Sequence, residues 1–262
     1  MPAGGIAVVP ADTPELEPFL GRTDIEIRRF DRSSVVRLDP GNSLVRASSA
    51  QSSTDGAPGR TWWEFEVPGG EGGVVEQLEL ALPFDQRHLA ENLLAALTAY
   101  RALGLPLERA QDGAARITLS RWRSDVRSLP DGGIVVNDAY NANPTSMRAA
   151  LLDLVERAGD RRRVAILGEM AELGAESERY HGKVAELIRE LGIEVVIGVG
   201  EPARAYLAAA PESHWVGGAG DVDQIVELVR PGDAVLVKAS RAVGLEGIPH
   251  EIEKKAGAWS AS

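Results

Sequence analysis

Apolar positions follow two different periods along the chain, and the first predicts β-strands. Up to residue 83, short apolar runs partly alternate with polar positions and are separated by turns. We interpret as strands the runs 6–9, 25–27, 35–38, 62–67 and 74–80. A short helix is expected to open at residues 10–14. The polar stretch 48–59 is the segment in which we expect local disorder.

The period changes after residue 83. Apolar residues recur every three or four positions from 89 to 100, which predicts an amphipathic helix that ends at Gly104 and Pro106. A second short helix over residues 107–114 completes a helical pair. We place a domain boundary after this pair, near Ile117.

The remaining part of the chain alternates regularly between two kinds of segment. Apolar runs at 134–136, 164–167, 195–197 and 234–237 each precede a helical pattern. Short apolar strands that alternate with amphipathic helices predict a parallel sheet covered on both faces, the arrangement of a Rossmann-like α/β domain. The predicted domains are therefore residues 1–117 and 118–262.

Composition excludes several classes of protein. The 262 residues carry a net charge of −11, which argues against general nucleic-acid binding because phosphate contacts need a basic surface. The absence of cysteine excludes disulfides, thiolate nucleophiles and sulfur-ligated metals. The sequence contains no run of 18 apolar residues that would span a membrane. Residues 1–5 lack the charged and apolar regions of a secretory signal, so we expect a cytoplasmic protein.

Polar residues crowd after the strand at 134–136, where ligands of open parallel sheets bind. Asn143 followed by Pro144 suits a helix cap, which would make this a simple capping loop. Asp138, Tyr140 and Asn141 have no evident structural role. A carboxylate in this position can accept hydrogen bonds from ribose hydroxyls. A capping loop and a ligand site remain equal alternatives here.

Lys238, Ser240 and Arg241 follow the strand at 234–237. Two cations and a hydroxyl at a strand end predict an anion site for a carboxylate or phosphate, with ordinary surface charge as the alternative. The segment 168–174 with His181 offers two carboxylates and a histidine, for which we favour structural roles over a metal site. The glycine-containing segment 198–203 is interpreted as a tight turn.

Two upstream features add candidate chemistry. His88 and Asn92 lie one turn apart on the same side of the predicted helix and are able to contact a base. Arg123 lies at the domain junction, where a cation is able to reach into an interdomain cleft.

Taken in order, these segments resemble the Mur ligase family from about residue 5 to 252. The segments that carry the resemblance are His88-x-x-x-Asn92, Arg123, the string Asn-Asp-Ala-Tyr-Asn-Ala-Asn-Pro-Thr-Ser-Met at 137–147, Leu-Gly-Glu-Met-Ala-Glu-Leu-Gly at 167–174 with His181, and Leu-Val-Lys-Ala-Ser-Arg at 236–241. The resemblance implies that residues 1–117 are the end of a central ATP-binding domain. It identifies residues 118–262 as the family's Rossmann-like C-terminal domain.

The resemblance also implies an ATP-dependent ligase of peptidoglycan precursor synthesis. ATP would phosphorylate the carboxylate of a UDP-N-acetylmuramoyl-tripeptide, and the amine of D-alanyl-D-alanine would attack the acyl phosphate, with ADP and phosphate released. His88 and Asn92 would line the adenine pocket, Arg123 would reach the phosphates, and Asp138 would hold the ribose. Tyr140, Asn141 and Asn143 would shape the same cleft. Lys238, Ser240 and Arg241 would face the dipeptide, with Arg123 and Lys238 acting in catalysis.

The chain departs from the family's pattern in two places. Leu89 follows His88 where family members commonly have asparagine, and no G-x-x-G-K-[ST] phosphate loop occurs in the sequence. We therefore expect a C-terminal portion of a ligase whose Mg²⁺ ligands lie elsewhere, with the missing N-terminal portion as a possible second chain and no turnover alone. The alternative is a non-catalytic module that binds a nucleotide or D-amino-acid peptide and regulates a partner. The string at 140–143 argues against a ligase that extends folate with glutamate.

Overall fold

The computed structural model describes residues 4–38, 60–69, 74–119 and 122–260. The chain divides into two compact units, Met1–Thr118 and Leu119–Ser262, next to the boundary expected near Ile117. The stretch 48–59, in which we expected disorder, lies outside the described residues.

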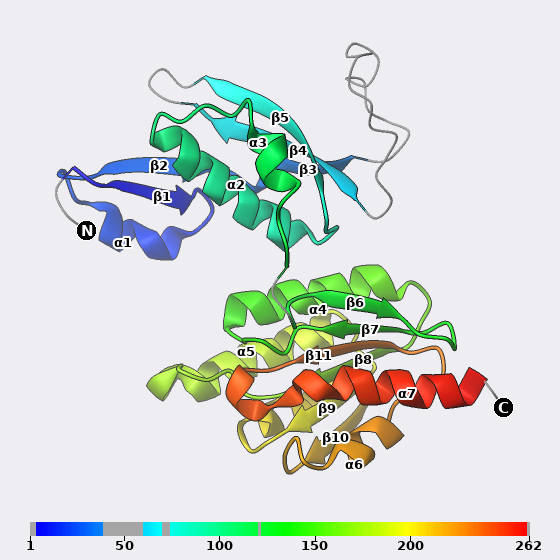
Figure 1. Ribbon diagram of the computed structural model, residues 1–262. Coiled ribbons are helices and arrows are strands. Elements are labelled where there is room, and N and C mark those ends of the chain that lie inside the picture. The colour runs from blue at the N-terminus through cyan, green and yellow to red at the C-terminus, as the bar shows by residue number, and fades with distance from the viewer. Residues whose placement is uncertain (1–3, 39–59, 70–73, 120–121, 261–262) are drawn as a thin grey trace. The chain divides into compact units, whose positions relative to one another are not determined.

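The first unit contains two small sheets (Figure 1). The parallel sheet pairs β1 (Ile6–Pro10) with β2 (Glu26–Phe30), and α1 (Glu17–Leu20) lies between them in the chain. The antiparallel sheet consists of β3 (Val35–Leu38), β4 (Thr61–Pro68) and β5 (Val75–Leu82). All five predicted strands are therefore present, with ends that differ from the prediction by at most three residues.

The predicted amphipathic helix is α2 (Arg87–Ala102), and the second helix, α3 (Ala110–Ala114), is shorter than expected. The apolar face of α2 packs against β4, where Trp63 and Phe65 are fully buried. Trp63 donates its indole N–H to the carbonyl of Phe84 at 3.2 Å, so its polar atom is satisfied in the core. The first unit thus has a hydrophobic core of its own.

The second unit is built on a six-stranded sheet in the order β10-β9-β8-β11-β7-β6. The strands are β6 (Asp125–Ser128), β7 (Ile134–Asn137), β8 (Arg163–Leu167), β9 (Val195–Val199), β10 (Glu212–Val216) and β11 (Ala234–Lys238). All neighbours pair in parallel except β6, which runs antiparallel to β7. The predicted Rossmann-like α/β class is confirmed, and the sheet gains two edge strands that we did not predict.

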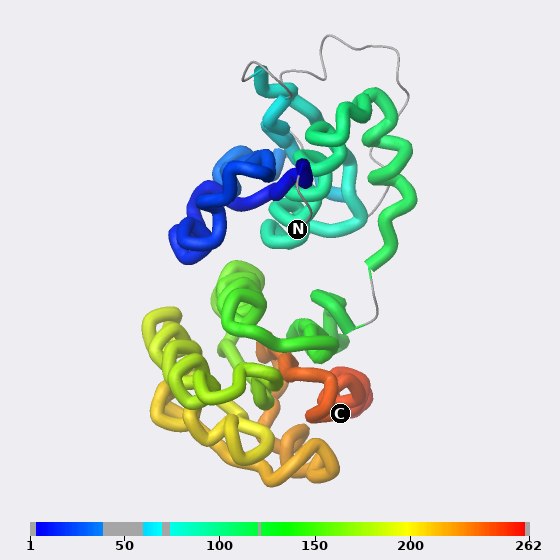
Figure 2. The backbone as a smooth tube through the Cα atoms, turned by 90° about the vertical axis from the view of Figure 1, so that its left-hand side faces the viewer, coloured from blue at the N-terminus to red at the C-terminus, as the bar shows by residue number. Residues whose placement is uncertain are grey.

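Helices cover both faces of this sheet (Figures 1 and 2). Alternate residues of each strand point to opposite faces. One buried cluster joins Leu151 and Ile188 to strand residues such as Leu236. The other joins Ile225 and Ile252 to the opposite face. The helices are α4 (Pro144–Ala158), α5 (Ser177–Glu190), α6 (Val222–Glu227) and α7 (Ile248–Ser260). The helix expected from Pro202 is instead a 3₁₀ segment, Pro202–Ala209, in which the amide of Arg204 bonds to the carbonyl of Glu201.

The direction of β6 brings residues 122–124 to the carboxyl edge of the sheet. Parallel strands end at one common edge, so the segments that follow β7, β8 and β11 meet there. Because β6 is antiparallel, its first residue, Asp125, pairs with Asn137 at the end of β7. The residues just before β6 therefore lie beside the residues just after β7.

Candidate functional site

A buried ammonium group lies at the centre of the carboxyl edge. Lys238 is the last residue of β11 and is only 1% exposed. Its ammonium group donates to Oδ2 of Asp138 at 2.5 Å and to the carbonyl of Asn141 at 2.8 Å. The carbonyl of Asp138 is a third acceptor at 3.5 Å. Burial lowers the pKa of Lys238, while Asp138 favours the charged form and Arg123 disfavours it.

Asp138 joins this ammonium to the segment that precedes β6. Its Oδ1 accepts a hydrogen bond from the amide of Ser124 at 3.1 Å, and Tyr140 donates its amide to the carbonyl of Trp122 at 3.1 Å. Sequence reasoning left Asp138 without a structural role, because its partner Lys238 lies one hundred residues away in the chain. The expected ribose contact remains a proposal.

The segment 122–124 holds an unusual backbone conformation. Trp122 and Ser124 have φ angles of 62° and 49°, in the left-handed region that favours glycine. Such residues persist only where surrounding contacts determine them. Two hydrogen bonds to the loop after β7 are such contacts, and they leave Arg123 between two constrained neighbours.

Two guanidinium groups lie near one aromatic ring at this edge. The guanidinium carbon of Arg123 lies 4.4 Å from the ring centre of Tyr140, and that of Arg241 lies 5.9 Å from it. Arg241 also lies 5.8 Å from the ring of Trp122. Arg123 and Arg241 are exposed, and no carboxylate among the described residues pairs with either of them. Cations gathered over aromatic faces are suited to bind a negatively charged group.

Ser240 and the residues that cap α4 have structural roles. Ser240 is 4% exposed, and its hydroxyl accepts the amide of Ala171 at 2.8 Å and donates to the carbonyl of Ala142. Asn143 caps α4 through reciprocal hydrogen bonds with Ser146, as the capping interpretation of the sequence required. Asn141 is exposed, and its side chain accepts the amide of Ala142.

His181 fixes the loop after β8. It is 1% exposed, accepts the amide of Met170 at Nε2 and contacts the carbonyl of Ser177 through Nδ1 at 2.8 Å. Its ring stacks on Tyr206, whose hydroxyl donates to the carbonyl of Gly168. These contacts fit the structural role favoured from the sequence. Among the described residues, no group of three histidine or acidic side chains is placed to hold a metal ion.

The predicted turn at 198–203 is explained by backbone proximity. Gly200 has a φ of 85°, and a Cβ at Gly198 would lie 2.8 Å from the carbonyl oxygen of Ala203. Gly198 therefore permits the close approach of strand and 3₁₀ segment, and Gly200 permits the positive φ of the turn.

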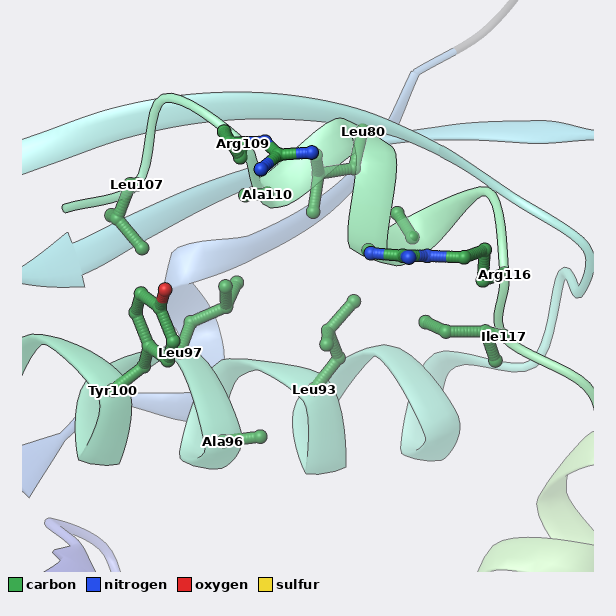
Figure 3. Close-up of a pocket in the computed structure, with 12 residues that line it drawn as sticks. Leu80, Leu93, Ala96, Leu97, Tyr100, Leu107, Arg109, Ala110, Arg116 and Ile117 are labelled. Atoms are coloured by element: carbon green, nitrogen blue, oxygen red, sulfur yellow. The ribbon is translucent and has the colours of Figure 1, made fainter. Parts of the chain in front are cut away.

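The other two predicted site residues belong to the first unit. His88 is half-buried and Asn92 is exposed, and both lie on α2. A cavity of about 440 Å³ lies between α2, α3 and β5, with Leu80, Leu93 and Leu97 in its walls and the side chains of Arg109 and Arg116 beside it (Figure 3). Neither His88 nor Asn92 lines this cavity, so it is separate from the adenine pocket that we expected them to form.

Residues missed by sequence reasoning are Trp122 and Ser124. Both contribute to the carboxyl edge through backbone atoms or through a ring next to Arg241. A tryptophan beside Arg123 was visible in the sequence, but no residue type signals a left-handed serine.

Among the described residues, no helix combines the length and apolar character that a membrane crossing requires.

Comparison with known proteins identifies the family. Residues 122–241 match the family model described as Mur ligase, glutamate ligase domain. The UDP-N-acetylmuramoyl-tripeptide–D-alanyl-D-alanine ligase of Mycobacterium leprae is 37% identical over 264 residues, which cover 92% of this chain and 50% of the relative. The chain belongs to the Mur ligase family. The resemblance inferred from the sequence is therefore confirmed.

Other Mur ligases extend the comparison over nearly the whole chain. The Escherichia coli enzyme of the same name is 28% identical over 259 residues, which cover 97% of this chain and 53% of the relative. The crystal structure of MurF ligase from Thermotoga maritima in complex with ADP has a TM-score of 0.68 at 23% identity, and the match covers 98% of this chain and 55% of that one. This last likeness shows the fold. The chain spans about half the length of the Mur ligases that it matches.

Proposed function

We propose that the chain supplies the acceptor-binding part of a ligase that adds D-alanyl-D-alanine to a UDP-N-acetylmuramoyl-tripeptide. The relatives that carry this name support the proposal. In this proposal, the phosphate-binding loop and the Mg²⁺ ligands come from another portion, in the same polypeptide or in a second one. ATP would be the phosphoryl donor, as the ADP bound to the Thermotoga maritima ligase suggests for that enzyme.

The observation that carries the proposal is the pair of guanidinium groups over Tyr140. Arg123 and Arg241 approach one ring from positions more than one hundred residues apart in the chain, in a protein whose net charge is −11. Two like charges near one ring repel each other, and a bound anion removes that repulsion. The reaction proposed above presents two anions, a phosphate and the dipeptide carboxylate.

Each residue then has a defined task. Arg123 neutralises phosphate charge, and Arg241 binds the dipeptide carboxylate through charge-assisted hydrogen bonds. Tyr140 and Asn141 border both anions, while Asp138, Asn143 and Ser240 hold the loops in place. Asp138 is also proposed to contact the ribose. His88 and Asn92 are proposed to contact the adenine. Catalysis by these residues is positioning and charge neutralisation, because none of them has to exchange a proton with the reactants.

Calorimetry on the purified chain tests the task of Arg241. We expect Arg241→Ala to weaken D-alanyl-D-alanine binding about tenfold or more, since a hydrogen bond to a charged group is worth about 1.5–3 kcal/mol. The dipeptide amide, which lacks the carboxylate, should bind wild type and variant equally. Arg189→Ala, an exposed arginine on α5, is the matched control. Equal dipeptide affinity in Arg241→Ala and wild type would contradict the assignment.

The same design tests Arg123 with a different pair of ligands. Arg123→Ala should weaken ADP binding while leaving adenosine binding unchanged, because only ADP carries phosphates. A separate assay of turnover tests the need for another portion: D-alanyl-D-alanine-dependent release of ADP by the purified chain alone would show that this part of the proposal is wrong.

A further inference from the structure

We infer that Lys238 is a positioning residue that holds Arg123 in the anion site and does not itself contact the ligand. This inference rests on the proposed function for the identity of the anions. It replaces the direct contact between Lys238 and the dipeptide that sequence reasoning expected, and it makes Arg241 the cation that the dipeptide meets.

The first argument is that the ammonium group has no donor left. An ammonium carries three hydrogens, and Lys238 has three oxygen acceptors, all from the loop after β7. At 1% exposure, its side chain offers no surface to a ligand. A ligand contact would require one of these hydrogen bonds to break inside a buried site. The hydrogen bond gained to the ligand would only replace the bond that was lost.

The second argument is that the contacts of Lys238 lead to Arg123 by a continuous path. The ammonium fixes Oδ2 of Asp138, and Oδ1 of the same carboxylate accepts the amide of Ser124. This amide follows directly after Arg123 and belongs to a residue with a φ of 49°. The ion pair therefore contributes to keeping Ser124 in a conformation that it would otherwise leave.

The third argument is electrostatic. Arg123 lies near enough to Lys238 to disfavour its charged form, so the two cations act on the same region of the site. A buried cation that binds no ligand still attracts an anion to the exposed guanidinium groups. Lys238 thus acts on the site through its ion pair with Asp138 and through its positive charge, without contacting the ligand.

The wild-type protein permits a direct test, because the sequence has only four lysines. In a sample labelled with ¹⁵N at lysine and arginine, the Lys238 ammonium should give a resonance with slowed hydrogen exchange. Addition of ADP or D-alanyl-D-alanine should shift the side-chain N–H resonances of Arg123 and Arg241 and leave the Lys238 resonance in place. A shift of the Lys238 resonance as large as that of Arg241 would overturn the inference.

A variant tests the path from Lys238 to Ser124 without any ligand. Lys238→Met removes the charge at similar length, and we expect amide exchange at Ser124 and Tyr140 to accelerate about tenfold or more, because opening of this segment becomes easier. Amides within β8 should keep their exchange rates. Lys183→Met, at an exposed lysine on α5, is the matched control.

The two kinds of failure are distinguishable. Absence of any binding by wild type would contradict the proposed function, while the exchange experiment would still decide the role of Lys238. If Lys238→Met does not fold, the double variant Lys238→Met/Asp138→Asn removes the stranded carboxylate and should show the same faster exchange at Ser124. Unchanged exchange at Ser124 in a folded variant would show that Lys238 does not position this segment.

Discussion

Three non-glycine residues among those described have left-handed backbone conformations, and all three lie at or next to the carboxyl edge of the second unit. They are Trp122, Ser124 and Glu172. Each such residue costs about 1–2 kcal/mol relative to ordinary backbone conformations. Strain gathered at one edge of a sheet marks the part of the molecule whose shape is held by specific contacts.

Ser124 allows this strain to be measured. We expect Ser124→Gly to be more stable than Ser124→Ala by about 0.5–1 kcal/mol, because glycine adopts a positive φ without the cost of a Cβ, although it loses more entropy on folding. Both variants lack the hydroxyl, so its contribution cancels in the comparison. Urea unfolding of the two variants measures the difference, and equal stability would mean that the conformation carries no strain.

For single residues, the sequence predicted a side chain's role where the partners of that side chain are its neighbours in the chain. The cap at Asn143 depends on Pro144 and Ser146, which are its neighbours in the chain. The partner of Asp138 is Lys238, and that of Ala171 is Ser240, and neither pair has a local signature. Local spacing predicted a polar loop at this edge, but only the fold shows which of its side chains are already occupied.

At the scale of elements, the opposite edge of the sheet is held by an ion-pair network. Asp233, directly before β11, is 2% exposed and accepts two hydrogen bonds from Arg162 at 2.8 and 2.9 Å. It also accepts the amide of Arg230 at 2.8 Å. Arg162 reaches Glu212 on β10 as well. The network therefore ties β8, β10 and β11 together at their amino ends, away from the candidate site.

Loss of Asp233 should lower the stability of this unit without changing the structure of the carboxyl edge. We expect Asp233→Ala to reduce the free energy of unfolding by about 3 kcal/mol, since it removes a buried carboxylate that accepts hydrogen bonds from Arg162 and from the amide of Arg230. Glu201→Ala, in an exposed pair with Arg204, should cost less than about 0.5 kcal/mol. Thermal unfolding measures both variants. A similar small effect for both would show that the buried pair contributes no more than a surface one.

The two strands that sequence analysis missed share one property. β6 has the sequence Asp-Val-Arg-Ser and β10 the sequence Glu-Ser-His-Trp-Val, and both lie at edges of the sheet. An edge strand is only partly buried, so it lacks the continuous apolar run by which central parallel strands are recognised. The central strands were predictable because burial on both faces demands apolar residues.

At the scale of the whole molecule, each unit encloses hydrophobic clusters of its own. One cluster lies within the first unit, and two lie on the two faces of the six-stranded sheet. A polypeptide segment with a complete core is able to fold by itself. We therefore expect residues 119–262, expressed alone, to fold cooperatively.

Nuclear magnetic resonance checks this expectation. The separate unit should give the same slowed Lys238 ammonium resonance as the full chain, because every oxygen around that group belongs to residues 138–141. A disordered spectrum from residues 119–262 would contradict the expectation. A spectrum of residues 1–118 expressed alone shows whether the first unit also folds by itself.

The reversal of β6 decides where the polypeptide arrives in the second unit. A parallel β6 would start at the amino ends of the other strands, and its four residues would carry the preceding segment about 13 Å from the carboxyl edge. As it is, the chain enters the sheet at the carboxyl edge itself, with Arg123 two residues before the first residue of β6. A change of backbone direction at residues 122–124 would reach the proposed anion site without passing through any other part of the unit.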